Sequence, residues 1–176
     1  MKPERLARRI IHESPWVNLY VDRVRFPNGR VIDDFHLIDF PYAAVTMIAE
    51  NGQGSIVFSR IVRYATGTAE WELPAGGVES GETELEAARR EVLEETGYAS
   101  DGHRLLYSYF PMNGNANMRF HVVHCRAGER LQDFDREEVT DVRWFTRAEA
   151  RQMIKDQLIT DGFTLTALLL WMQGDV

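Results

Sequence analysis

Several features that point to particular classes of protein are scarce or missing in this sequence. Cys125 is the single cysteine, so no intrachain disulfide can form and a reducing compartment is expected. The longest apolar run, residues 165–172, is far shorter than the ~20 residues that cross a bilayer. The opening residues lack the apolar stretch of a signal peptide. We therefore expect a soluble, cytoplasmic protein.

Positive charge is also scarce compared with negative charge. The chain has 20 lysine and arginine residues against 27 aspartate and glutamate residues, for a net charge of −7. This charge disfavours non-specific binding to nucleic acid or to an anionic membrane, so neither is expected as a partner. Only Lys2 and Lys155 are lysines. The preference for arginine fits either genome composition or phosphate binding, for which arginine is the better bidentate ligand.

The remaining composition predicts one globular domain with a small appendage. The chain has 176 residues, 44% of them hydrophobic, which is enough for a core. Residues 16–26 and 31–40 alternate at period two around an Asn-Gly turn and predict a small N-terminal antiparallel β unit over residues 1–40. In residues 41–176, strand patterns alternate with three helical ones, which indicates an α/β domain. The helices are expected at about 84–96, from 146 onward and at about 162–173.

The predicted helix at 84–96 is unusually acidic. Residues 76–98 contain seven glutamates but only two arginines. Thr83 and Glu86 have the spacing of a capping box, and Gly97 suits the left-handed position at a helix end. These signals favour a helix despite its unbalanced negative charge.

Three of these glutamates form a candidate cation site. Glu91 and Glu95 are four residues apart on one flank of the stripe that would pack on a sheet, with Glu94 farther round. Carboxylates that converge at the edge of a core either acquire raised pKa values or stay ionised beside a hard cation such as Mg²⁺. On charge alone, a solvent-facing acidic helix is an open alternative.

The spacing of this segment resembles the Nudix box, G-x5-E-x7-R-E-U-x-E-E-x-G-U, where U is an aliphatic or aromatic residue. Every specified position matches, from Gly76 through Glu82 and Arg90 to Tyr98. The resemblance implies a Nudix α/β/α sandwich with a mixed sheet. It also implies metal-dependent hydrolysis of a nucleoside diphosphate linked to another group.

The resemblance implies roles for individual residues of the box. Glu91, Glu94 and Glu95 would hold one or more Mg²⁺ ions, for which Mn²⁺ is a possible substitute. Glu82 would support the metal site from the preceding loop, and Arg90 would orient neighbouring carboxylates. A tight turn at the glycines after Ala75 would let the Ala75 carbonyl reach the metal.

The segments beside the box resemble the ADP-ribose and nucleotide-sugar pyrophosphatase branch of the family. Residues 71–76 read WELPAG as in that branch, and residues 60–63 read RIVR where the branch has R-Q-Y-R. Arg63 is therefore a candidate ligand for a substrate phosphate, with a surface arginine as the alternative. Glu72 is a candidate contact to substrate or to a partner subunit.

The same branch suggests substrate and catalytic residues outside these segments. Met112 would line the pocket for the terminal ribose, although the proline before it comes slightly earlier than in the ADP-ribose signature. Trp16 is a candidate to stack on adenine, with core or interface packing as the alternative. Glu138 corresponds to a loop glutamate that serves as metal ligand or catalytic base, and Glu137 is the fallback.

These inferences together predict a Mg²⁺-dependent pyrophosphohydrolase that cleaves ADP-ribose, or a related nucleoside diphosphate sugar, to AMP and a sugar phosphate. The N-terminal β unit would mediate a homodimer and help to build the nucleotide site. Two alternatives remain open. One is a Nudix hydrolase of another specificity, such as diadenosine polyphosphate or coenzyme A cleavage, and the other is a Nudix-fold sensor that binds without cleaving.

Overall fold

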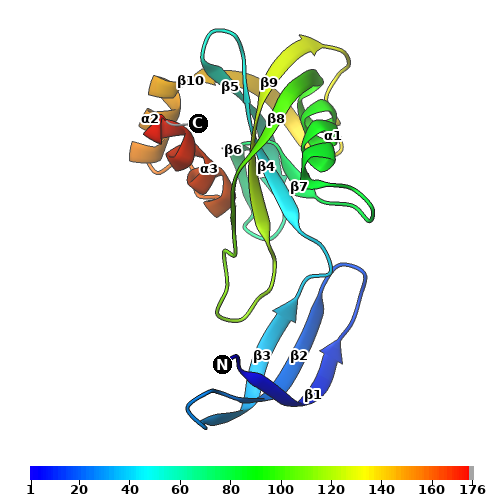
Figure 1. The fold of residues 1–176 in the computed structure, drawn as a ribbon. Coiled ribbons are helices and arrows are strands. Elements are labelled where there is room, and N and C mark those ends of the chain that lie inside the picture. Colours follow the sequence, from blue (N-terminus) through cyan, green and yellow to red (C-terminus); the bar gives the residue numbers. More distant parts are fainter. Residues whose placement is uncertain (175–176) are drawn as a thin grey trace. The chain divides into compact units, whose positions relative to one another are not determined.

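The computed structural model describes residues 1–174, which form two compact units (Figure 1). The first unit consists of Met1–Ala43 together with Tyr109–Arg119. The second unit consists of Ala44–Ser108 and the chain from Phe120 onward. Each unit is described by itself below.

The first unit is built on a three-stranded antiparallel sheet in the order β1-β2-β3. The strands are β1 (Glu4–His12), β2 (Asn18–Arg25) and β3 (Val31–Asp39). The Asn-Gly turn joins β2 to β3, and Gly29 adopts the left-handed conformation with φ of 85°. The sequence patterns predicted β2 and β3 but missed β1, because β1 is exposed almost throughout and shows no alternation of apolar and polar residues.

The segment 109–119 belongs to the first unit because it is hydrogen-bonded to the end of β3. The Ile38 amide donates to the Asn115 carbonyl at 2.8 Å. The Asn117 side chain donates to the Asp39 carboxylate at 2.6 Å and accepts from the Phe40 amide at 2.7 Å. The loop that carries Met112 is thereby fixed to the N-terminal sheet.

The second unit contains a seven-stranded mixed sheet. Its main order is β10-β5-β4-β9-β8, with β6 paired to β5 and β7 paired to β4. The β4–β9 pair is parallel, and β10–β5, β4–β7 and β5–β6 are antiparallel. The strands are β4 (Ala44–Glu50), β5 (Ser55–Arg63), β6 (Thr68–Glu72), β7 (Ala75–Gly77), β8 (Tyr98–Tyr109), β9 (Phe120–Arg130) and β10 (Val139–Thr146).

Helices cover both faces of this sheet (Figure 1). Helix α1 (Glu84–Thr96) packs on one face, and α2 (Arg147–Lys155) and α3 (Gly162–Gln173) lie on the other. The predicted α/β/α sandwich with a mixed sheet and an additional small antiparallel β unit is confirmed. All three predicted helices are present.

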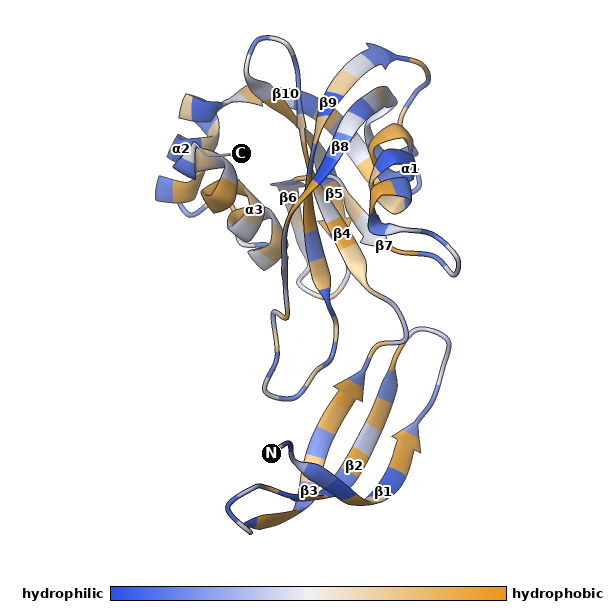
Figure 2. Cartoon of the chain, in the orientation of Figure 1, coloured by the Kyte–Doolittle hydropathy of each residue, from blue (hydrophilic) through white to orange (hydrophobic). Residues whose placement is uncertain are grey.

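The core of the second unit lies between the central strands and the helices. Strand β4 is buried almost throughout, and Figure 2 shows its apolar residues lying between the helical layers. Val45 and Met47 of β4 pack with Ala88 and Val92 of α1. The contact joins the apolar residues that recur every two positions along the strand to those that recur every 3.6 positions along the helix. On the other face, α3 buries Trp171. In the described chain, none of the helices is long and apolar enough to cross a membrane.

Candidate active site

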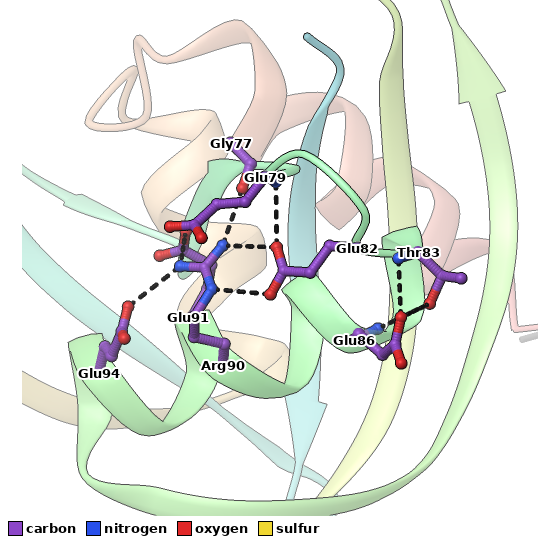
Figure 3. A network of polar contacts seen from close by, with 8 residues as sticks. All are labelled: Gly77, Glu79, Glu82, Thr83, Glu86, Arg90, Glu91 and Glu94. Carbon is purple, nitrogen blue, oxygen red and sulfur yellow. Dashed lines mark hydrogen bonds and ion pairs between the residues drawn. The ribbon is translucent and has the colours of Figure 1, made fainter.

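The acidic segment forms strand β7, a loop and helix α1. Thr83 caps the helix: its side chain accepts a hydrogen bond from the Glu86 amide, and the Glu86 carboxylate accepts one from the Thr83 amide at 2.8 Å (Figure 3). Gly97 ends the helix in the left-handed conformation with φ of 76°. A Cβ at position 97 would lie 2.2 Å from the Gln132 carbonyl oxygen, so only glycine fits there. Both helix ends thus follow the signals in the sequence.

Arg90 connects the loop to the helix through a network of ion pairs (Figure 3). Its Nε and Nη2 donate to the two carboxylate oxygens of Glu82 at 2.9 and 3.0 Å. Its Nη1 donates to Glu91 at 2.7 Å and to Glu94 at 3.1 Å. Nη2 also donates to the Gly77 carbonyl at 2.9 Å. One guanidinium therefore fixes three carboxylates of the box, and its hydrogen bonds to Glu82 lower the pKa of that carboxyl.

Glu91 and Glu95 are buried carboxylic acids, with 9% and 5% of their surface exposed. Burial raises the pKa of Glu91, although Arg90 opposes the shift. The pKa of Glu95 is raised well above its ordinary value by burial and then by the charge of Glu91, against the opposing charge of Arg63. The Glu95 Oε2 atom is buried and has no hydrogen-bond partner. A nearby positive charge stabilises two adjacent buried acids of this kind as carboxylates.

The absence of a side chain at Gly76 provides the space for Glu91. A Cβ at position 76 would lie 1.9 Å from Glu91 Oε1 and 2.1 Å from Glu91 Cδ. Strand β7 therefore passes directly against the carboxylate, which an alanine would displace. The sequence predicted a tight turn at these glycines, but Gly76 and Gly77 lie in strand β7. The close approach to Glu91 was not predicted, although the glycine of the motif was a signal for it.

The loop between β9 and β10 brings Glu138 to the same carboxylates. The charge of Glu138 raises the pKa of both Glu91 and Glu95. The fallback residue, Glu137, is not among the main charges that act on either acid. Both residues are exposed to solvent. Of the two, Glu138 is the one whose charge acts on the buried acids.

The structure pairs Arg63 and Glu72, the two substrate-binding candidates of the second unit. Arg63 Nη2 donates to Glu72 Oε2 at 2.6 Å, and Arg63 Nε donates to Oε1 at 3.0 Å. The Glu72 side chain is 4% exposed and that of Arg63 is 47% exposed. Glu72 is thus positioned to orient the guanidinium, with Nη1 outside the pair. Trp16 and Met112 lie in the first unit, where 72% and 50% of their surfaces are exposed.

The residues of this site suit a divalent cation in their chemistry. Glu91 and Glu95 supply buried oxygen ligands, one of them without a hydrogen-bond partner, and the Ala75 backbone is hydrogen-bonded to Glu95. In the present conformation, no three acidic, histidine or cysteine side chains of residues 1–174 are grouped closely enough to hold a metal ion. Arg90 is instead the cationic partner of Glu91 and Glu94.

Comparison with known families identifies the fold and the box. Residues 41–164 match the sequence model of the NUDIX domain. The chain belongs to the Nudix family. Residues 4–38 match the nucleoside diphosphate sugar hydrolase N-terminal domain, which accompanies the Nudix domain here. The resemblance stated from the sequence is confirmed, and the chain is a Nudix hydrolase.

Three relatives of this Nudix hydrolase span most of its length. It is 26% identical to the ADP-ribose pyrophosphatase of Bacillus subtilis, over 96% of this chain and 91% of that one. It is 29% identical to the CMP-5'-(N-acetyl-N-hydroxy-3-aminopropyl)phosphonate hydrolase of Streptomyces rubellomurinus, over 92% and 79%. It is 32% identical to the methanol dehydrogenase activator of Bacillus methanolicus, over 86% and 83%.

A solved structure supports the fold assignment. The crystal structure of an ADP compounds hydrolase superposes with a TM-score of 0.83 and covers 100% of this chain and 98% of its own. The two sequences are 20% identical, so this likeness concerns the fold. This Nudix hydrolase is therefore related in sequence to an ADP-ribose pyrophosphatase and shares its fold with an ADP compounds hydrolase.

Proposed function

We propose that this Nudix hydrolase cleaves the diphosphate of ADP-ribose, or of a related nucleoside diphosphate sugar, in a reaction that depends on Mg²⁺. The observation that carries the proposal is the pair of buried acids, Glu91 and Glu95, within an intact Nudix box. Burying two acids side by side is costly unless a cation belongs there. The WELPAG segment beside the box and the ADP-ribose pyrophosphatase relative support this substrate class.

Glu91, Glu94 and Glu95 would hold the Mg²⁺ together with the carbonyl of Ala75, and Mn²⁺ could replace it. Glu138 would serve either as a further metal ligand or as the catalytic base. When bound, the ion neutralises the diphosphate and lowers the pKa of a water molecule. In this proposal, Arg90 and Glu82 do not contact the substrate. They keep the carboxylates of Glu91 and Glu94 in fixed positions, because Arg90 binds all three glutamates at once.

The carboxylate of Glu138 would accept the proton of the attacking water. A catalytic base must reach the proton that it removes, and an exposed loop residue whose charge acts on the buried acids is suited to that role. The oxygen of the water forms a bond to one phosphorus, and the bridging oxygen leaves with the other phosphate. With ADP-ribose, the products are AMP and ribose 5-phosphate.

Four residues would bind the substrate. Arg63 would bind a phosphate through its free Nη1 edge while Glu72 keeps the guanidinium oriented. Trp16 would stack on adenine, and Met112 would contact the terminal ribose. We further propose that the N-terminal unit, residues 1–40, mediates a homodimer of the 41–176 Nudix domain. Its exposed apolar residues Ile10 and Ile11 suit such an interface.

A substrate panel tests this proposal. The panel contains ADP-ribose, ADP-glucose, NADH, diadenosine polyphosphates, coenzyme A and a CMP-linked phosphonate, each incubated with Mg²⁺ and resolved by chromatography. We expect the highest kcat/KM for ADP-ribose or another nucleoside diphosphate sugar. A preference for one of the other substrates would establish a different Nudix specificity. Ligand-induced stabilisation with no product from any of them would establish a sensor and refute the enzymatic role.

A further inference from the structure

The loop between β9 and β10 is attached to the end of the helix that carries the buried acids. The Asp135 amide donates to the Glu94 carbonyl at 2.8 Å, and the Leu131 amide donates to the Gly97 carbonyl at 2.9 Å. Glu94 lies in the last turn of α1, where a helix leaves carbonyl groups without intrahelical partners. The loop supplies a partner for one of them. This attachment holds the loop close to the backbone of the Nudix box.

Asp135 also shapes the turn that carries Glu138. Its Oδ1 accepts a hydrogen bond from the Glu137 amide at 2.8 Å, and its carbonyl accepts one from the Val139 amide at 3.0 Å. Aspartate and asparagine commonly fix a turn by accepting from the amide two residues later. Val139 is 1% exposed and begins β10. The turn is thus closed by Asp135 on one side and by the core on the other.

The backbone and side chain of Asp135 therefore connect two parts of the site. The backbone amide binds the carbonyl of Glu94, and the side chain and carbonyl close the turn around Glu138. The other aspartate of this loop, Asp133, has different partners. Its carboxylate pairs with Arg130 and Arg136. Of these two aspartates, Asp135 is the one that accepts hydrogen bonds from the residues on either side of Glu138.

We propose that Asp135 is a positioning residue that holds Glu138 in register with the carboxylates of the Nudix box. This inference rests on the proposed function, because it assumes that Glu138 acts in hydrolysis. Without the side chain of Asp135, the exposed turn 135–139 loses the hydrogen bond that orders its centre. Glu138 would then sample several orientations, and the fraction of molecules with a correctly placed base would fall.

Five variants test the proposal against a purely structural role. Asp135→Ala removes the acceptor, whereas Asp135→Asn keeps an oxygen at the same place. Asn51→Ala is a matched control, because Asn51 Oδ1 accepts from the Gln53 amide at 2.9 Å in an equivalent turn between β4 and β5. Glu138→Gln removes the proposed base. The double variant Asp135→Ala/Glu138→Gln shows whether Asp135 acts through Glu138.

We expect Asp135→Ala to lower kcat about tenfold or more, toward the roughly 10²–10⁴-fold loss expected for Glu138→Gln, with little change in KM. Asp135→Asn should retain most of the activity, and Asn51→Ala should match the wild type. In the Glu138→Gln background, Asp135→Ala should cause no further loss. Amide hydrogen exchange should show that Asp135→Ala exposes the Glu137 and Val139 amides, while Asp135→Asn protects them.

The possible contrary results are distinguishable. An active wild-type protein with an equally active Asp135→Ala variant overturns the positioning role alone. The positioning role is also overturned if Asp135→Asn lowers kcat as much as Asp135→Ala does. It is likewise overturned if Asp135→Ala lowers kcat by its full factor again in the Glu138→Gln background. A wild-type protein that hydrolyses no member of the substrate panel refutes the proposed function and the positioning role together.

Discussion

Gly76 lies directly against the carboxylate of Glu91, which makes Gly76→Ala a sharp perturbation of the site. A Cβ at this position would lie 1.9 Å from Glu91 Oε1, whereas ordinary contacts of this kind begin at 3.4 Å. Glu91 is buried and bound to Arg90, so it has little room to yield. We expect its carboxylate to move by about 1 Å or more, and a displacement of that size near a reacting group costs about 10²-fold in rate.

The same substitution should have a moderate effect on folding. Overpacking of a core position costs about 1–3 kcal/mol, and each kcal/mol lowers Tm by about 2–4 °C in a domain of this size. A 10²-fold loss of rate corresponds to about 2.7 kcal/mol of transition-state stabilisation. The variant should therefore remain folded at 25 °C and still be nearly inactive.

Steady-state hydrolysis of ADP-ribose at saturating Mg²⁺, together with thermal unfolding, measures both effects. Gly52→Ala is the matched control, because nothing lies within 4 Å of a Cβ at position 52. It should have wild-type kcat. A folded Gly76→Ala protein with wild-type kcat would refute the argument that Glu91 must occupy this space during catalysis.

Three further substitutions test the charges of the site. Glu95→Gln should stop hydrolysis. In metal-free protein at pH 8 it should also raise the free energy of unfolding by about 1–3 kcal/mol, and Tm with it, because it removes a buried charge. The pKa of Glu95 is raised in the folded state, so the wild type loses stability as the pH rises above the pKa that Glu95 has in the unfolded chain. The stability difference between Glu95→Gln and the wild type should therefore shrink toward pH 4, and a pH-independent difference would contradict this. Arg63→Met should lower the free energy of unfolding, measured in urea, by about 1–3 kcal/mol, because Glu72 is left buried and unpaired. Adding Glu72→Gln should recover most of the loss, and an unchanged stability of Arg63→Met would refute the pairing. Arg90→Lys should lower activity about 10–100-fold in a Mg²⁺ titration, because one ammonium cannot bind Glu82, Glu91 and Gly77 together. Wild-type activity in this variant would show that the network is dispensable.

The sequence predicts the central helix and its caps well because those features depend on local chemistry. The Thr83–Glu86 capping box and the left-handed Gly97 are present as the spacing indicates. The match to the Nudix box identified the family for the same reason, since the box is one continuous loop, helix and cap. Strand β1 was missed because its residues 4–12 are exposed and follow no period.

The contacts that connect distant segments could not be read from the sequence. Gly76 and Glu91 are close because β7 passes against α1, and the glycine of the box indicates a special position without identifying its neighbour. Arg63 and Glu72 are not opposite one another in the β5–β6 register, in which Arg63 aligns with Thr68 and Glu72 with Ser59, so strand pairing alone would not have predicted their ion pair. Asp135 binds the Glu94 carbonyl across 41 residues of chain, so its place in the site appears only in the structure.

The most direct test of the account is the product balance of a single reaction with ADP-ribose. The purified protein is incubated with ADP-ribose and Mg²⁺, and AMP and ribose 5-phosphate are quantified by ion-exchange chromatography against the substrate consumed. The account predicts equimolar AMP and ribose 5-phosphate, and no turnover when EDTA removes the metal. Intact ADP-ribose after prolonged incubation with Mg²⁺, or hydrolysis that continues unchanged in EDTA, would contradict it.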